Sequence, residues 1–158
     1  MIVDRLDGHE TQDHPHASDL SLLAARTVDA LDWAARRDEL AHLPTGLWAT
    51  GVAAGAALTA ATRRPARVAA VVASSGRPDL AGPALARLAI PTLLIVGGND
   101  PEGLAFNRAA MLELTCEKRL EVVPGAAPGF GEPGSLEAMA HLAGAWLAAR
   151  LSAGFERQ

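Results

Sequence analysis

The chain has 158 residues, of which 49% are hydrophobic and 20% are charged, the balance of an ordinary globular protein with one core. Its formal net charge of −4 argues against a nucleic-acid-binding surface, which needs clustered Lys and Arg. The single cysteine, Cys116, excludes an internal disulfide and favours a reducing cytoplasm. No apolar run reaches the length of a membrane span, and we expect no membrane partner.

Residues 1–17 are polar, and we interpret them as a lead-in to a single domain that spans 18–158. Three histidines in this segment, His9, His14 and His16, raise the hypothesis of a metal site. No helical or strand spacing holds these histidines together, so we predict a solvated segment and no metal.

A helix is predicted to begin at Ser18, which can cap it, and to run to about Arg37 or Leu40 before Pro44 breaks it. Its apolar stripe has the i, i+3, i+4, i+7 spacing and consists of Leu20, Leu23, Thr27, Leu31 and Ala34.

The remainder alternates between short apolar runs and helical patterns. The predicted strands, each apolar on both faces as buried parallel strands are, cover 46–50, 68–73, 92–96 and 120–123. The predicted helices cover 52–62, 82–88, 104–114 and 136–151. This alternation predicts an α/β fold of about four parallel strands with flanking helices. If the strands lie in sequence order, right-handed crossovers put the connecting helices on one face and leave the last helix to cover the other.

The stretch 46–58 resembles the nucleophile elbow of α/β-hydrolases of the dienelactone-hydrolase type, the strand–turn–helix that carries a catalytic Ser or Cys. Three further segments resemble that family in the same order. They are 75–81 after the second strand, 91–100 with its following acid, and 122–134, which matches the last strand and the loop that carries the family's histidine. The resemblance covers about 18–151 and implies a partial α/β-hydrolase fold.

Compared with the motifs of this family, the sequence has an incomplete catalytic triad. Gly51 stands where the resemblance implies the nucleophile, Pro128 where it implies the histidine base, and Asp100 remains as the acid. The family's domain begins with about four more strands, which also bring one oxyanion-hole amide. Without them strand 46–50 becomes an edge strand. The resemblance therefore implies a C-terminal half-domain, whether the protein is short by nature or the sequence is a fragment.

Other residues are candidates for catalysis or for lining a cleft. Ser74 and Ser75 close the second strand at the rim where parallel sheets place active sites, but a role as turn serines is the simpler interpretation. Together with Thr50 and Val52 they are candidates for lining an old cleft. Cys116 lies at the opposite end of its strand and is interpreted as a structural thiol, and Asp100 is also a candidate helix cap.

Two glycines near the elbow, Gly51 and Gly55, are predicted to permit close helix–sheet packing. They form neither a dinucleotide fingerprint nor a P-loop, so we predict no cofactor.

Three functions stay open. The first is a degenerate, catalytically silent hydrolase-type domain that works by association, either with itself or with a partner chain, through strand 46–50. The second is an active ester or lactone hydrolase that uses other residues or residues of a partner. The third is a small-molecule binding module in the remaining cleft.

Overall fold

The computed structural model describes residues 20–155, with side chains to residue 152. The predictions made for 1–17 and for a cap at Ser18 fall outside the described residues. No helix in the described part of the chain is long and apolar enough to cross a membrane.

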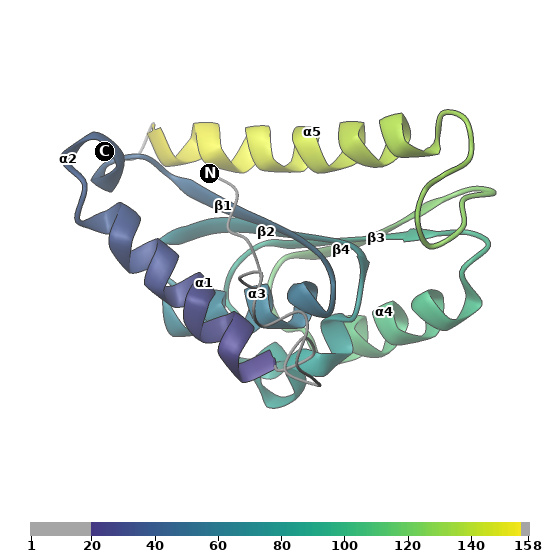
Figure 1. The fold of residues 1–158 in the computed structure, drawn as a ribbon, viewed down its shortest axis with the longest axis horizontal. Coiled ribbons are helices and arrows are strands. Elements are labelled where there is room, and N and C mark those ends of the chain that lie inside the picture. The colour runs from purple at the N-terminus through teal and green to yellow at the C-terminus, as the bar shows by residue number, and fades with distance from the viewer. Residues whose placement is uncertain (1–19, 156–158) are drawn as a thin grey trace, which may run out of the picture.

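The described chain alternates between strands and helices, as the sequence predicts (Figure 1). Helices and strands occur in the order α1 (Leu20–Ala35), α2 (Asp38–Ala41), β1 (Thr45–Gly51), α3 (Val52–Arg63), β2 (Val68–Gly76), the 3-10 segment η2 (Pro78–Arg87), β3 (Thr92–Gly97), α4 (Pro101–Glu113), β4 (Lys118–Val123) and α5 (Ser135–Phe155). The predicted first helix is divided in two because Arg37 has an extended backbone conformation.

The four strands form one parallel sheet in the order β1-β2-β3-β4, which confirms the predicted fold. Helices α3 and α4 lie on one face of the sheet, α1 packs against α3, and α5 alone crosses the other face (Figure 1). This is the arrangement expected when successive right-handed crossovers join strands in sequence order.

Two hydrophobic cores lie on opposite faces of the sheet. Along β2, Val71 and Ala73 face the core under α3 and α4, and Ala70 and Val72 face the core under α5. The alternation of side chains along a strand explains this division, because every second residue points to the same face. Residues 68–73 of the strand are therefore all apolar, since both of its faces are covered.

The strands differ in burial. Every residue of β3 is buried, whereas β4 exposes Lys118 and Arg119 and leaves Glu121 only partly buried. The prediction that the 120–123 strand is apolar on both faces is therefore wrong, because β4 begins earlier and forms an edge of the sheet. Strand β1 forms the other edge, and it contains no charged residue.

Candidate functional site

The turn between β1 and α3 has the shape of a nucleophile elbow. The strand ends at Gly51, whose φ of 55° and ψ of −138° lie where residues with a side chain are strained, and α3 starts at the next residue. No atom lies within 4 Å of a Cβ built on Gly51. The predicted packing role is therefore wrong for Gly51, which serves the turn. Gly55 does permit close packing, but against α1 and η2 and not against the sheet, because a Cβ there would be 2.9 Å from the Leu20 side chain and 3.0 Å from the Leu80 side chain.

The loop that follows β4 carries Pro128, where the sequence resemblance predicts the position of the family's base. The carbonyl oxygen of Pro128 accepts a hydrogen bond from the Oγ of Ser75. Ser75 has a φ of 44°, an unusual value for a residue with a side chain. Its neighbour Gly76 pairs with Gly51 across the sheet. The structure thus places Ser75 beside the Gly51 turn and in contact with Pro128.

Asp100 follows β3 and is only 9% exposed. Its side chain accepts a 2.8 Å hydrogen bond from the backbone N–H of Gly103 and caps α4, which begins at Pro101. An N-cap of this kind satisfies one of the free amides of the first helical turn. This contact gives Asp100 a structural function that needs no histidine.

The same loops are joined to each other by hydrogen bonds. The side-chain amide of Asn99 donates to the Gly125 carbonyl at 2.9 Å. Both carboxylate oxygens of Glu132 lie 3.1 Å from the Ala127 nitrogen. These contacts hold the loop in the absence of a histidine–aspartate pair.

The other candidate residues lie at or next to the carboxyl ends of β1 and β2, where Thr50 and Ser74 are paired across the two strands. Ser74 is buried, and its Oγ accepts a 2.9 Å hydrogen bond from the indole of Trp48. Thr50 is exposed near the end of β1. Val52 packs against the small apolar cluster formed by Leu23, Ala24 and Ala56 between α1 and α3. Of the two serines, Ser75 is therefore the one that contacts Pro128.

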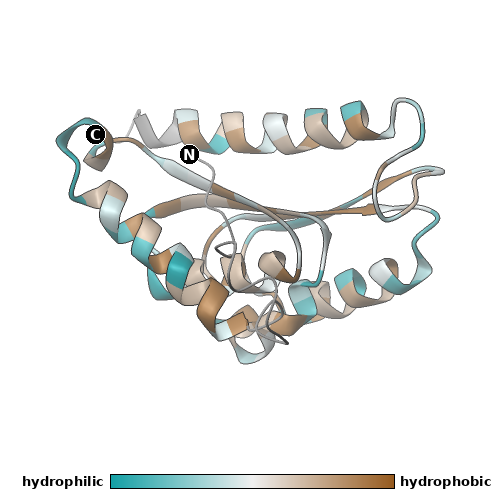
Figure 2. Ribbon diagram, in the orientation of Figure 1, coloured by the Kyte–Doolittle hydropathy of each residue, from teal (hydrophilic) through white to brown (hydrophobic). Residues whose placement is uncertain are grey.

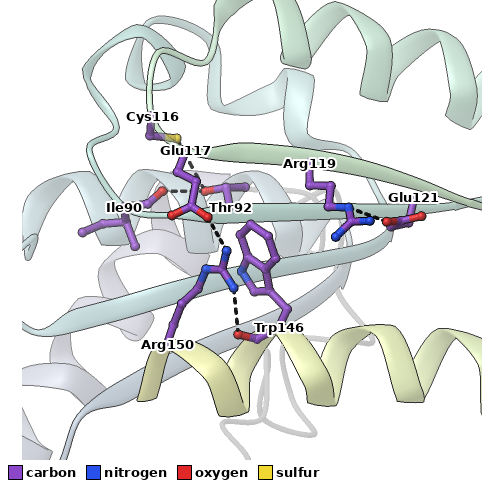
Figure 3. Close-up of polar contacts among 8 residues, drawn as sticks. All are labelled: Ile90, Thr92, Cys116, Glu117, Arg119, Glu121, Trp146 and Arg150. Atoms are coloured by element: carbon purple, nitrogen blue, oxygen red, sulfur yellow. Dashed lines mark hydrogen bonds and ion pairs between the residues drawn. The ribbon is translucent and has the colours of Figure 1, made fainter. Parts of the chain in front are cut away.

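A second group of polar contacts ties α5 to the start of β4 (Figure 3). Arg150 on α5 pairs with Glu117 and lies over the Trp146 ring, with its Cζ 3.1 Å from the ring centroid. Nearby, the Sγ of Cys116 lies 4.0 Å from the Thr92 hydroxyl, and burial raises the pKa of this thiol. A raised pKa leaves less reactive thiolate, in accord with a structural role.

No group of three or more His, Cys, Asp or Glu side chains suited to a metal ion occurs within residues 20–152. A groove of about 300 Å³ lies at the amino ends of β1 and β2, away from the Gly51 turn. Its lining includes Leu40, Leu43, Pro44, Thr45 and Arg67. The amino-acid sequence did not predict this groove. The only signal was the pair of leucines in a segment otherwise interpreted as a helix break.

Comparisons with known proteins agree with this geometry. The solved structure of a dienelactone hydrolase from Anabaena variabilis is 42% identical in sequence and superposes with a TM-score of 0.90, covering 94% of this chain and 70% of that one. A dienelactone hydrolase-like promiscuous phosphotriesterase from metagenomic libraries, P91, has the same fold at 17% identity, with a TM-score of 0.62 over 91% of this chain and 70% of its own.

A curated Mycobacterium tuberculosis protein named "Putative phosphoribosyl transferase Rv0571c" is 42% identical over 146 residues, which are 92% of this chain. The match is 33% of that protein, so the chain spans about a third of the length of this relative. No protein-family model matches the sequence. The likeness to the Anabaena enzyme, in sequence and in fold over more than two thirds of both chains, shows that this chain belongs to the dienelactone hydrolase family of α/β-hydrolases.

Proposed function

We propose that the chain is a catalytically silent dienelactone-hydrolase-type domain that acts by association through β1. The observation that carries this proposal is the elbow at Gly51, which keeps the sharp turn but has no nucleophilic side chain. Pro128 has no group that can accept a proton, so the position of the base is empty as well. The one acid left, Asp100, caps a helix.

Nucleophilic catalysis needs a nucleophile and a base within hydrogen-bond reach of each other. In this chain the corresponding contact is made by Ser75, whose hydroxyl proton points to the Pro128 carbonyl. A carbonyl oxygen accepts the hydrogen bond but cannot take the proton, so the contact orients the hydroxyl without activating it. The Ser75–Pro128 contact therefore supports a catalytically silent domain.

Association is supported by the contrast between the two edges of the sheet. Natural edge strands are protected from pairing by charged residues, and β4 carries three of them. Strand β1 has none, and it exposes 46% of Trp48. Free backbone groups beside apolar side chains favour pairing with another strand.

The mycobacterial relative supports the same view, because two thirds of its length lies outside the match. We infer that hydrolase-type domains of this kind act beside a phosphoribosyl transferase-type chain or domain, and that this chain supplies the accessory part.

Light scattering on the isolated chain over a wide range of concentrations tests the association. We expect the mass to rise with concentration, and Trp48→Lys to reduce the rise because it places a charge beside the edge strand. Leu112→Lys is the matched control, since Leu112 is 85% exposed on α4. A stable monomer that neither change affects would contradict the proposal.

A second candidate, an ester hydrolase with Ser75 as nucleophile, is favoured by one observation. Ser75 combines a φ of 44° with a position at the carboxyl end of β2, and strained residues gather at active sites. Hydrolysis of p-nitrophenyl acetate by the wild type and by Ser75→Ala distinguishes the two candidates. We expect neither protein to hydrolyse the ester faster than it hydrolyses in buffer alone. Turnover by the wild type that Ser75→Ala abolishes would contradict the proposal of a silent domain and support the ester hydrolase.

A further inference from the structure

A group of arginines lies at the end of the sheet opposite to the elbow. Arg36 and Arg37 follow α1, whereas Arg63, Arg64 and Arg67 lie at the end of α3 and before β2. These five are more than a third of the 14 lysines and arginines of a chain whose net charge is −4. Figure 2 shows that the chain from the end of α1 to α2 is hydrophilic. Positive charge is therefore concentrated at one end of an acidic protein.

One carboxylate, that of Asp32 on α1, is already paired within this group. Arg64 donates a 2.7 Å hydrogen bond to each of its two oxygens. These hydrogen bonds lower the pKa of Asp32 first of all, and the charges of neighbouring arginines, among them Arg36 and Arg67, lower it further. Arg36 and Arg67 thus lie close enough to act on Asp32. Neither of their guanidinium groups has a hydrogen-bond or ion-pair partner among the described residues.

The groove at the amino ends of β1 and β2 adjoins these arginines. Arg67 is part of its lining, and so is Ala35, the residue before Arg36. The lining also includes the polar side chains of His42 and Thr45. No Asp or Glu of the described part of the chain belongs to it. The groove therefore combines a free positive charge with polar side chains and has no carboxylate that would repel an anion.

Two simpler roles do not account for Arg67. Positive side chains stabilise the carboxyl end of a helix, but Arg63 already lies in the last turn of α3, and Arg67 is four residues further on. Ion pairing with the acids that begin α2 is the other role. Among the described residues, however, no arginine is paired with Asp38 or Glu39. The Arg67 guanidinium is therefore available to a ligand.

We propose that this groove binds a small molecule that carries a phosphate group, with Arg67 and Arg36 at the phosphate. Two unpaired guanidinium groups match the roughly two negative charges of a phosphate ester. A carboxylate needs only one, as Asp32 shows with Arg64. The planar guanidinium can also donate two hydrogen bonds to phosphate oxygens.

The size of the groove agrees with a small ligand. Its volume of about 300 Å³ lies at the lower end of the range for small-molecule sites. Apolar residues of the lining, among them Ala34, Leu40 and Leu43, can contact the remainder of the ligand. The site lies away from the Gly51 turn and from the exposed edge of β1, so it goes beyond the proposed function and does not depend on association.

Isothermal titration calorimetry with phenyl phosphate tests this site, because this molecule joins a phosphate to an apolar ring. We expect saturable binding at low salt, and weaker binding of benzoate, which has the same ring but a single negative charge. Arg67→Gln should weaken the binding of phenyl phosphate at least about tenfold, and Arg36→Gln should weaken it as well, because each removes charge-assisted hydrogen bonds. Arg67→Lys keeps the charge but not the fork, and should give an intermediate affinity.

The matched controls are Arg87→Gln and Arg108→Gln, which remove the same charge from exposed residues of η2 and α4. They should leave the affinity unchanged, and melting temperatures check that all variants fold. Equal weakening by Arg67→Gln and Arg87→Gln would mean that net charge alone attracts the anion, and would overturn the inference. Benzoate that binds as tightly as phenyl phosphate, or no binding of either molecule, would also overturn it. Trp48→Lys should leave phosphate binding intact, so a failure of this site is distinguished from a failure of association through β1.

Discussion

Gly51 and Gly55 lie one helical turn apart but are needed for different physical reasons. Gly51 needs its backbone conformation, because its φ is 55° while the space for a Cβ is open. Gly55 has no positive φ, but a Cβ there would lie 2.9 Å from Leu20 and 3.0 Å from the carbonyl oxygen of Arg77. A positive φ at a turn and a tight contact of a helix thus both require glycine, and the sequence alone does not distinguish the two.

The first stability prediction follows from this difference. We expect Gly51→Ala to lower the free energy of unfolding by about 1–3 kcal/mol through backbone strain. Gly55→Ala should cost a similar amount, about 1–3 kcal/mol, through overpacking. Gly144→Ala is the control, because Gly144 in α5 has neither problem and alanine should stabilise it by about 0.5–1 kcal/mol. Urea unfolding measures all three, and a wild-type midpoint for Gly51→Ala would refute the strain argument.

At the scale of elements, α5 alone covers one face of the sheet, and two kinds of contact hold it there. Trp146 is 7% exposed and belongs to the core under the helix. Arg150 pairs with Glu117, whose side chain is 61% exposed (Figure 3). Exposed ion pairs contribute little because water screens the charges and ordering the side chains costs entropy. Packing of Trp146 should therefore dominate the attachment of α5.

The corresponding variants separate these contributions. We expect Trp146→Ala to destabilise the fold by about 3–5 kcal/mol, as large-to-small changes in a core do. Glu117→Gln should cost no more than about 1 kcal/mol and should do so mainly at low salt. Thermal unfolding of both variants at two salt concentrations makes the comparison. Equal losses in the two proteins would mean that the ion pair, and not the indole, anchors the helix.

At the scale of the whole molecule, the two edges of the sheet are unequal. Strand β4 ends the sheet with charged side chains, one of which, Arg119, is paired with Glu121 (Figure 3). Strand β1 ends it with small and apolar ones. The expected self-association of the isolated chain and its sensitivity to Trp48→Lys belong at this scale, because β1 is an edge only through the order of all four strands in the sheet.

Much of the fold could be predicted because its signals are local. The alternation of apolar runs with helical patterns predicts a parallel sheet in sequence order, and handedness puts α5 alone on its face. Strand ends were less predictable. Strand β2 continues through Ser74 to Gly76, and β4 begins at the charged Lys118, since hydrogen bonds to neighbouring strands extend both beyond their apolar runs.

Sequence by itself determined that Gly51 has no side chain and that Pro128 has no titratable group, because both are matters of residue identity. The tertiary structure decided what the surrounding residues do instead. Contacts across 53 residues join Ser75 to Pro128. Folding also brings α2 and the amino ends of β1 and β2 together around the groove. Such contacts join residues distant in the chain, and no local pattern of residue types encodes them.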